Sequence, residues 1–429
     1  MTLEVVVLLG AMLGLIVLGL PLVFSIGCSS LLTILLFHHR LPLEMIPQYI
    51  VGGTDSFALL AIPFFFLAGE IMNSAGMTAR IVKFSDGLVG GIRGGLSHVN
   101  VVTNMIYAGI SGSAVADAAA IGSFMIPSMI RSGYSPGFSA AINAAAATIG
   151  PIIPPSIPMI IYAVLANVSV GQLFLSGVFP GLFMGGYLMI VAFFISLRRN
   201  YPRGKFMSFL ELLRLGARVF LAFLSPLIII GGILLGVFTA TEAGAVAVLY
   251  SILIGFFVYR ELTLRRLWEI FKETIVSTGT VLIIVGVSYL FGWIIAQSGI
   301  AGKIGEIILT ISKNPNIVLL ELMIFFFIVG MFMDPLAGLI IFVPIFLPIV
   351  TSLGVHPVHF GLITVLNLMI GLLTPPVGYL LYITSAISGE KVEVVIRECI
   401  PFLGALILVL FICVYWPGMV MYLPNLMGP

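Results

Sequence analysis

The polar residues of this chain that are best placed for chemistry lie at four interruptions of long apolar stretches. The interruptions are Ser111 to Ala114, Gly150 to Ser156, Phe332 to Gly338 and Leu373 to Gly378. The two ends of a helix leave up to four N–H groups and four carbonyl groups without partners, with partial positive charge at the amino end and partial negative charge at the carboxyl end. Hard cations prefer oxygen ligands. The pattern therefore favours Na+ bound by carbonyl and hydroxyl oxygens, with helix amino ends facing an anion.

The same turn residues occur twice in the chain, 221 positions apart. Pro127, Gly133, Pro136, Pro154 and Pro155 are matched by Pro348, Gly354, Pro357, Pro375 and Pro376. Proline cannot donate a backbone hydrogen bond and disfavours a helical residue before it, so each Pro-Pro pair must break a helix. In lipid, non-helical backbone is tolerated only where protein or a water-filled cavity shields it. A break repeated in both halves indicates a binding site at the repeat interface, as in secondary transporters.

The composition places the chain in a membrane. It is 60% hydrophobic and 8% charged, whereas soluble domains are about 45 to 50% apolar and about 25% charged. Residues 1–37 lack a basic leading segment and a small-residue cleavage pattern, so we expect them to belong to the mature protein. The basic residues form short clusters between apolar spans, which gives no indication of nucleic-acid binding. No GxxxxGK[ST] phosphate loop is present, so energy must come from ion gradients or from another subunit.

The lengths of the apolar segments predict the topology. Segments near the 20 residues that a crossing helix needs lie at 3–20, 22–37, 55–73, 137–168 and 178–197, and again at 219–237, 239–258, 275–297, 359–388 and 400–421. The segments 97–131 and 316–352 are too long for one crossing and are interrupted, so we predict that each is a re-entrant hairpin. The expected fold is an all-α polytopic membrane protein whose halves each have five crossing helices plus one hairpin. Because five is odd, the halves form an inverted repeat.

The distribution of Lys and Arg supports this topology. With the amino terminus outside, sixteen of these residues fall inside, and only Arg40, Lys303 and Lys313 fall outside. Cytoplasmic loops carry the excess of basic residues in membrane proteins. A single crossing by either long segment would invert everything after it and reduce the bias. We therefore predict a multi-pass protein with its amino terminus outside.

Two aspartates lie at or near the interruptions. An Asp near the bilayer centre costs about 2.5 to 3.5 kcal/mol on insertion scales and is usually functional. Asp334 could complete a cation shell, whereas Asp117 could either bind a cation or cap its own hairpin helix. Asn143 and Asn367 precede the Pro-Pro breaks, where an amide could reach substrate or bridge helices. Glu242 lies where two spans meet, which favours a capping role.

These features define two predicted Na+ sites and one predicted substrate site. The first Na+ shell comprises Ser111, Gly112, Ser113, Gly150 and Pro154. The second comprises Phe332, Asp334, Gly338, Thr374 and Pro375, mostly through backbone oxygens. The residues expected near substrate are Ser113, Asn143, Ser156, Asn367 and Gly378. An intramembrane aspartyl protease using Asp117 and Asp334 and a purely structural subunit are the alternatives. Neither aspartate lies in the GxGD-like context that would indicate such a protease. A purely structural subunit would not need repeated polar breaks.

The chain divides into a predicted scaffold and a predicted transport unit. The scaffold comprises 1–96 and 219–315, and the transport unit comprises 97–168 and 316–388. Residues 169–218 hold the last span of the first half and a basic cytoplasmic connector, and 389–429 hold the C-terminal span. If the transport unit moves as one body, something must hold the scaffold still.

Several stretches resemble one known family. GISGSAVADAAAIGSFMIPSM at 109–129, GPIIPPSIP at 150–158, GVFTATEAGAVAVLY at 236–250 and MDPLAG at 333–338 closely resemble the large membrane subunit of tripartite ATP-independent periplasmic (TRAP) transporters. The resemblance covers essentially the whole chain. It implies an elevator-type fold of the ion transporter superfamily and no enzymatic activity. The chain has no extra amino-terminal helices, so we expect an unfused large subunit whose small partner is a separate polypeptide.

The resemblance also implies a function and partners. It implies Na+-coupled uptake of an organic carboxylate, of the sialic acid or C4-dicarboxylate class, across the bacterial inner membrane with a periplasmic amino terminus. The implied partners are a small four-helix membrane subunit and a periplasmic binding protein that delivers substrate. No cofactor is implied beyond Na+ as the coupling ion.

Overall fold

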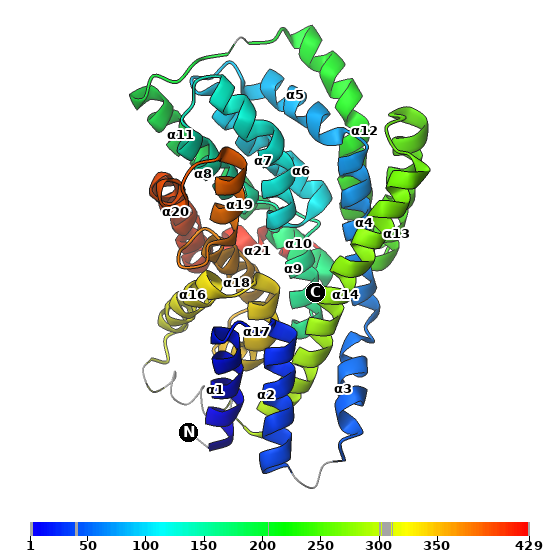
Figure 1. Cartoon of the computed structure of the whole chain (residues 1–429), viewed down its shortest axis with the longest axis vertical. Helices are drawn as coiled ribbons and strands as arrows, with labels where there is room; N and C mark the ends of the chain where they lie inside the picture. Colours follow the sequence, from blue (N-terminus) through cyan, green and yellow to red (C-terminus); the bar gives the residue numbers. More distant parts are fainter. Residues whose placement is uncertain are drawn as a thin grey trace.

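The computed structural model describes residues 3–38, 42–204, 206–299, 302, 310 and 312–427. Arg40, Lys205 and Lys303, which contribute to the predicted charge bias, lie outside the described residues. The described part of the chain is helical apart from turns, loops and one isolated antiparallel bridge between Arg93 and Arg203 (Figure 1). This confirms the predicted all-α class.

Within the described residues of its first half, the chain forms eleven α-helices and one short 3-10 helix at Phe57–Leu60. The α-helices are α1 (Leu3–Val17), α2 (Leu22–Phe37), α3 (Met45–Thr54), α4 (Ala61–Ser74), α5 (Met77–Val89), α6 (Gly95–Ser111), α7 (Ala114–Arg131), α8 (Pro136–Ala147), α9 (Ile157–Ala166), α10 (Val170–Ser176) and α11 (Val178–Arg198). Helices α3, α5 and α10 are short elements that the span analysis does not predict separately.

The second half repeats the long elements in the same order. Its described helices are α12 (Phe209–Leu234), α13 (Ala240–Leu253) with a π-helical end at Ile254–Val258, α14 (Leu264–Gln297), α16 (Pro315–Phe332), α17 (Pro335–Ser352), α18 (Pro357–Gly371), α19 (Tyr379–Ser388), α20 (Val392–Tyr415) and α21 (Pro417–Leu426). Glu242 forms a capping box with Thr239 at the start of α13, which confirms the predicted capping role.

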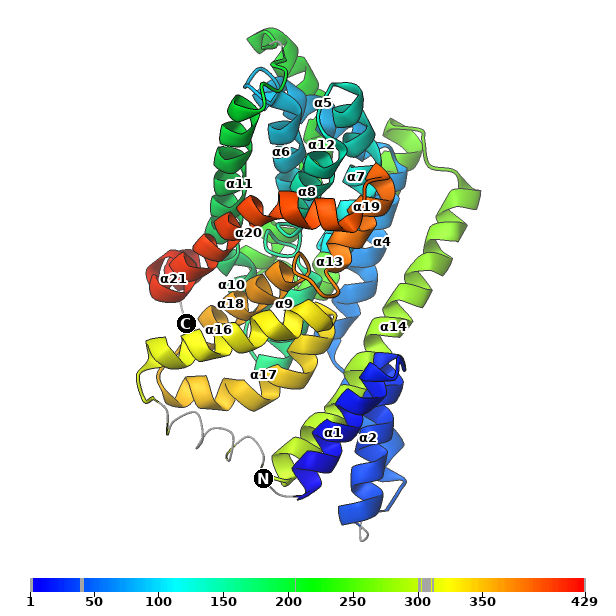
Figure 2. The ribbon, with the colours of Figure 1, turned by 60° about the vertical axis from the view of Figure 1, so that its left-hand side comes forward.

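Both long segments are helix pairs that break where the sequence predicts. Helix α6 ends at Ser111 and α7 begins at Ala114, with Gly112 in the left-handed conformation at φ +61°. Helix α16 ends at Phe332 and α17 begins at Pro335. The two members of each pair lie side by side (Figure 2). Their re-entrant passage relative to the bilayer remains a prediction.

The repeated turn residues occupy matching structural positions. Pro136 and Pro357 begin α8 and α18, and Gly133 and Gly354 both have positive φ. The Pro154-Pro155 and Pro375-Pro376 peptide bonds are both cis. The sequence repeat is therefore also a repeat of local structure.

Eight helices of the described residues are long and apolar enough to cross a membrane. They include α7, α16 and α17, which are arms of the predicted hairpins. The predicted crossings 137–168 and 359–388 are absent from this set because each is divided into two shorter helices, α8 with α9 and α18 with α19. A count by length therefore differs from the predicted number of crossings, because it omits these divided helices, the shorter α1 and α2 and the bent α12, and it includes three hairpin arms.

Two predicted spans differ in their boundaries. Helix α14 begins at Leu264, where the Thr263 hydroxyl caps it by accepting a hydrogen bond from the Arg266 N–H, and has 34 residues, about 51 Å at 1.5 Å per residue. The predicted span 400–421 corresponds to the apolar helix Val392–Tyr415, which is long enough to cross a membrane, but the predicted segment is not one continuous helix. It is divided at Trp416, because Pro417 disfavours a helical residue before it and instead starts α21.

The arms that lead to the Pro-Pro breaks form the centre of the core. Every residue of α8 after Pro136 is buried, and so is every residue of α18 after Pro357. Alanine makes up most of the second half of α8, which allows neighbouring helices to approach closely. The breaks are thus held by two helices that are almost entirely buried.

Candidate ion and substrate site

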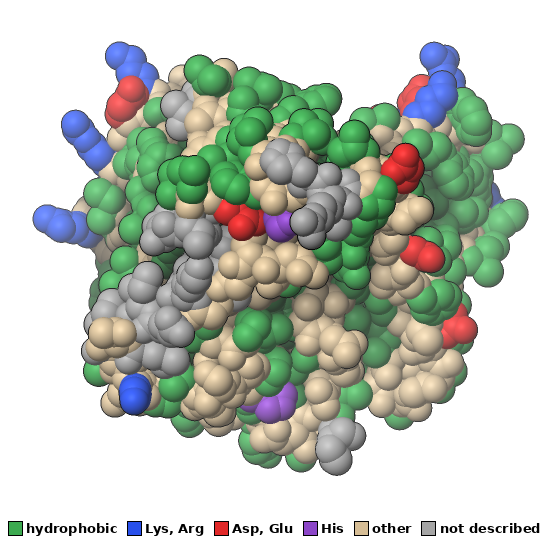
Figure 3. Space-filling view, turned by 90° about the horizontal axis from the view of Figure 1, so that it is seen from below, with side chains coloured by type: hydrophobic (Ala, Val, Ile, Leu, Met, Phe, Trp, Pro, Cys, Tyr) green, Lys and Arg blue, Asp and Glu red, His purple; other side chains and the backbone are tan. Residues whose placement is uncertain are grey.

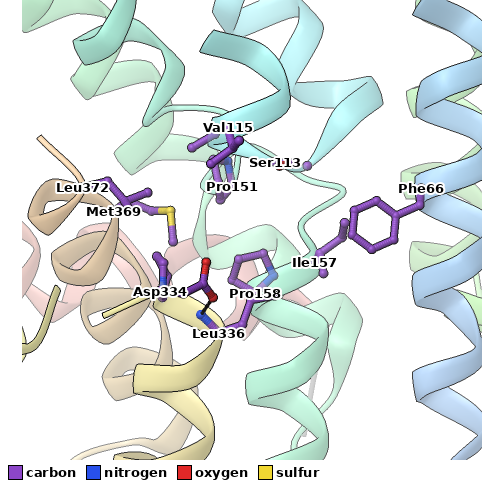
Figure 4. A pocket seen from close by; sticks show the side chains of 13 residues that line it. Phe66, Ser113, Val115, Pro151, Ile157, Pro158, Asp334, Leu336, Met369 and Leu372 are labelled. Atoms are coloured by element: carbon purple, nitrogen blue, oxygen red, sulfur yellow. Dashed lines mark hydrogen bonds between the residues drawn. The ribbon is translucent and has the colours of Figure 1, made fainter. Parts of the chain in front are cut away.

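The tips of both hairpins and the first Pro-Pro break meet at one cavity. This central cavity has about 400 Å³ of empty space and is lined by Phe66, Gly112, Ser113, Ala114, Val115, Pro151, Ile157, Pro158, Asp334, Pro335, Leu336, Met369 and Leu372. Figure 4 shows Asp334 at the start of α17 facing Pro158 of α9, with Phe66 of α4 on the other side. Segments that are about half the chain apart in sequence therefore build one site.

Asp117 is the charged group at the first break. Its side chain is fully buried, and one carboxylate oxygen accepts a hydrogen bond from the Ser111 hydroxyl. The other oxygen, Oδ2, has no hydrogen-bond partner among the described residues. Oδ2 faces Gly150, where an added β-carbon would collide with it. The carboxylate thus lies between two residues of the predicted first Na+ shell, although the sequence analysis left Asp117 out of that shell.

Ser113 is the cap of α7, and Asp117 is not. The Ser113 hydroxyl accepts a hydrogen bond from the backbone N–H of Ala116 at 3.4 Å, and the Ser113 N–H donates to the Ser111 hydroxyl at 3.3 Å. The sequence left open whether Asp117 binds a cation or caps its helix. Because Ser113 is the cap, the structure does not support the capping role of Asp117.

The hairpin tip packs directly on the Pro-Pro turn. A β-carbon at Gly112 would lie 2.7 Å from the Pro155 carbonyl oxygen. The Ser156 hydroxyl donates to the Pro151 carbonyl at 2.5 Å and accepts from the Met159 N–H at 3.3 Å, so it closes the turn and caps α9. Ser156 does not line the central cavity.

Free carbonyl groups remain at the first break. No backbone N–H of the described residues donates to the carbonyl oxygen of Gly150 or Pro154. Buried carbonyl groups are nearly always paired, so carbonyl oxygens without a backbone donor at this break are candidate ligands for a hard cation. The described residues contain no cluster of three or more His, Cys, Asp or Glu side chains for a metal ion.

The second break is arranged differently. Asp334 caps α17 by accepting a hydrogen bond from the Leu336 N–H at 2.9 Å, and it is exposed to the central cavity. The Thr374 hydroxyl donates to the Ile370 carbonyl at 3.2 Å. The Val377 N–H donates to the Met331 carbonyl at 3.3 Å, which ties this break to the end of α16.

Three other residues of the predicted ion and substrate sites lie outside the lining of the central cavity. The Phe332 side chain is 56% exposed, so only its backbone could belong to the site. Gly338 faces α18, where an added β-carbon would lie 3.0 Å from Leu368. Gly378 adopts φ +53° at the start of α19. None of the three lines the central cavity.

The two asparagines bridge helices. Asn143 on α8 donates to the Ala118 carbonyl at 3.0 Å and accepts from Asn100 at 3.1 Å. Asn367 on α18 donates to the Met323 carbonyl at 2.6 Å. Both side chains are fully buried and neither lines the central cavity. Of the two roles that the sequence left open, the structure favours the bridging role.

A second cavity adjoins the central one at Phe66, Ser113 and Val115. It has about 1140 Å³ of empty space, and its polar lining includes Glu70, Asn73, Tyr107, Ser111, Ser113, Glu273, Thr274 and Ser277. The sequence analysis missed both Glu70, an acidic residue within an apolar stretch, and Glu273, which lies in a charged segment just before a predicted span. This vestibule lies between α4 and α14 on one side and α6 and α7 on the other.

The fold has counterparts among solved transporters. The chain superposes on the YdaH transporter of Alcanivorax borkumensis with a TM-score of 0.61 and 16% identity, covering 90% of each chain. The fold and the helix breaks define an all-helical, polytopic membrane protein with a fold found in transporters.

Comparison with known sequences identifies the family. The model of the DctM component of the tripartite ATP-independent periplasmic transporter matches residues 9–419. The chain is 41% identical over 415 residues to the sialic acid TRAP transporter large permease protein SiaM of Vibrio cholerae, covering 96% of this chain and 97% of that protein. It is 38% identical over 404 residues to the C4-dicarboxylate TRAP transporter large permease protein DctM of Pseudomonas aeruginosa, covering 94% of each. The chain belongs to the DctM family of TRAP transporter large permeases, whose members are permeases and not enzymes.

Proposed function

We propose that this chain is the translocating subunit of a binding-protein-dependent TRAP system that couples Na+ to the uptake of an organic carboxylate. The observation that carries the proposal is the buried Asp117 carboxylate, which has one unpaired oxygen facing Gly150 at the first break. A buried charge without a partner is strongly unfavourable. A bound cation would neutralise it and would complete the oxygen set of Ser111, Gly150 and Pro154.

The substrate site is the central cavity. Helices α7, α9 and α17 begin at its wall, and their amino ends contribute partial positive charge. An anion would be stabilised there by backbone N–H groups and by the nearby Na+. The relatives named for sialic acid and for C4-dicarboxylates support a carboxylate of one of these classes.

The vestibule with Glu70 and Glu273 is the route to the cytoplasm. It approaches the end of α4 at Asn73 and the early turns of α14, where Arg266 forms an ion pair with Glu273. In contrast, Figure 3 shows that the opposite end has hydrophobic and uncharged side chains over most of its described face, with Lys and Arg mainly near the rim. This distribution supports a periplasmic amino terminus in the inner membrane.

The proposed mechanism is an elevator. The inverted halves each give a hairpin and a broken helix to the transport unit, 97–168 and 316–388. The remaining helices form the scaffold. A small four-helix membrane subunit enlarges the scaffold at α1, α2, α12 and α13, where large apolar side chains such as Leu13, Phe24 and Phe220 are exposed. A periplasmic binding protein, consistent with the tripartite family, delivers substrate.

Uptake in proteoliposomes tests the proposal. The chain is reconstituted with its small subunit and loaded binding protein, and uptake is measured with an inward Na+ gradient, with a pH gradient and with neither. We expect uptake only with the inward Na+ gradient. We also expect the Asp117→Asn variant to lose this sodium-driven uptake. Uptake driven by a pH gradient without Na+ would instead assign a proton to Asp117 and overturn sodium coupling.

A further inference from the structure

A basic pocket lies at the opposite end of α11 from the central site. It is lined by Gly91, Ile92, Arg93, Phe193, Leu197, Asn200, Tyr201, Pro202, Arg203 and Phe206 and has about 1090 Å³ of empty space. Its walls are the α5–α6 loop, the end of α11 and the connector that leads to α12. The connector crosses the upper end of the molecule in Figure 1.

The backbone fixes the two arginines side by side. Arg93 and Arg203 form the isolated antiparallel bridge. The Gly94 N–H donates to the Pro202 carbonyl at 3.0 Å, and the Gly204 N–H donates to the Gly90 carbonyl at 3.2 Å. Two chain segments that are about 110 residues apart are thereby tied together, so the spacing of the guanidinium groups does not depend on their side chains alone.

Neither arginine is neutralised within the described residues. Arg93 donates to the Asn200 amide oxygen at 2.7 Å, and Arg203 donates to the Gly91 carbonyl at 2.8 Å. The Arg93 Nε is buried and has no hydrogen-bond partner there. No carboxylate of the described chain forms an ion pair with either side chain. The pocket therefore carries two positive charges and free donors.

An apolar face of α11, which we call the α11 groove, leads away from this pocket. Phe179, Phe183, Gly186, Ile190, Phe193 and Leu197 recur at intervals of three or four residues, so they lie on one face of the helix. The first four of these residues line an apolar cavity that is separate from the vestibule, and the last two line the basic pocket. From Gly186 to Leu197 the groove extends about 16 Å, comparable with half of the roughly 30 Å hydrocarbon thickness.

We infer that this pocket and groove bind one anionic phospholipid of the cytoplasmic leaflet. The phosphate accepts hydrogen bonds from Arg93 and Arg203, and an acyl chain lies along the α11 groove. The charge complementarity is that of basic pockets between membrane helices, which bind anionic head groups. The inference depends on the proposed orientation, which places this end in the cytoplasm. The lipid would occupy the joint between α5–α6 and α11–α12, where the chain passes between scaffold and transport unit.

Native mass spectrometry of the purified full chain tests this inference. Palmitoyl-oleoyl phosphatidylglycerol is added, and phosphatidylcholine with the same acyl chains serves as the zwitterionic comparison. We expect one phosphatidylglycerol to be retained in preference to phosphatidylcholine. Because each basic residue near an anionic surface contributes about fivefold in affinity, Arg93→Gln and Arg203→Gln should each reduce retention about fivefold.

Matched variants separate the lipid site from general charge and folding effects. Arg265→Gln removes an arginine that is 91% exposed on α14 and should leave retention unchanged. Gly186→Trp should reduce retention without touching the arginines, because a β-carbon at Gly186 meets nothing within 4 Å and the indole can fill the groove. Equal retention by Arg93→Gln/Arg203→Gln and the unmodified chain would overturn the proposal. So would displacement by equimolar inorganic phosphate, which would indicate a free-anion site. Neither result depends on sodium-driven uptake.

Discussion

The Asp117 carboxylate and Gly150 face each other so closely that no β-carbon fits between them. Asp117 comes from the returning arm of the first hairpin and Gly150 from the end of the arm that precedes the Pro-Pro turn. Their contact joins two separate breaks into one oxygen-lined site. The glycine is needed for this approach, because any side chain would displace the carboxylate.

Gly150→Ala should impair transport more than protein stability. The added methyl group collides with Asp117 Oδ2 and must displace it from the proposed Na+ position. We expect sodium-driven uptake to fall by at least about tenfold, equivalent to about 1.4 kcal/mol. The control is Gly14→Ala on α1, where a β-carbon meets nothing within 4 Å. If Gly150→Ala and Gly14→Ala transport equally well with the same sodium dependence, Asp117 does not bind the ion in this position.

Asp334 should contribute to the sodium dependence through its charge. Asp334→Ala removes both the carboxylate and the cap of α17, and losing such a cap costs about 1 kcal/mol. Asp334→Asn keeps an oxygen for the Leu336 N–H and removes only the charge. We expect both variants to raise the Na+ concentration needed for half-maximal uptake, with a lower melting temperature only for Asp334→Ala. An unchanged sodium dependence in Asp334→Asn would remove this residue from the second shell.

Asn143 should stabilise the fold without selecting substrate. Asn143→Ala leaves Asn100 and the Ala118 carbonyl without their partner. Hydrogen bonds between membrane helices contribute about 0.6 kcal/mol on average and up to about 1.7, so two lost bonds should cost about 1 to 2 kcal/mol. Thermal unfolding in detergent measures this loss against Ser132→Ala, which alters an exposed hydroxyl. A changed substrate preference with an unchanged melting temperature would restore the substrate role.

Local breaks were predictable, whereas their assembly was not. Proline and glycine mark where α6, α8, α16 and α18 end, because their backbone restrictions act within a few residues. The contact between Asp117 and Gly150 depends on how two arms pack, and no periodic pattern encodes it. Asn143 shows the same limit, since an amide before a break suits a bridge and a ligand equally well until its neighbours are known.

Transport of a monoanion should be electrogenic if two Na+ ions accompany it. Moving the net charge of +1 through 100 mV contributes about 2.3 kcal/mol, and two tenfold Na+ gradients contribute about 2.8 kcal/mol. The sum of about 5 kcal/mol supports accumulation on the order of 10³ to 10⁴. Uptake should therefore increase when a potassium-valinomycin potential makes the vesicle interior negative. Uptake that does not respond to this potential would contradict the stoichiometry of two Na+.

The elevator predicts that links between transport unit and scaffold stop uptake. Gly109 on α6 belongs to the transport unit, and its added β-carbon would lie 3.0 Å from the Pro226 β-carbon on the scaffold helix α12. A β-carbon added at Gly244 on α13 would lie 2.9 Å from the Phe64 β-carbon on α4. Both of these helices belong to the scaffold. Small adjustments bring either pair to the roughly 3.5 to 4.5 Å of a disulfide.

The two cysteine pairs form a matched test in a background without the native cysteines Cys28, Cys399 and Cys413. We expect oxidation of Gly109→Cys/Pro226→Cys to abolish sodium-driven uptake, because the linked helices must slide past each other. Reduction should restore it. Oxidation of Phe64→Cys/Gly244→Cys should leave uptake intact, because that link joins parts that stay together. Uptake that survives the first link, with the disulfide verified by mass spectrometry, would exclude the elevator and favour small gating movements around a fixed site.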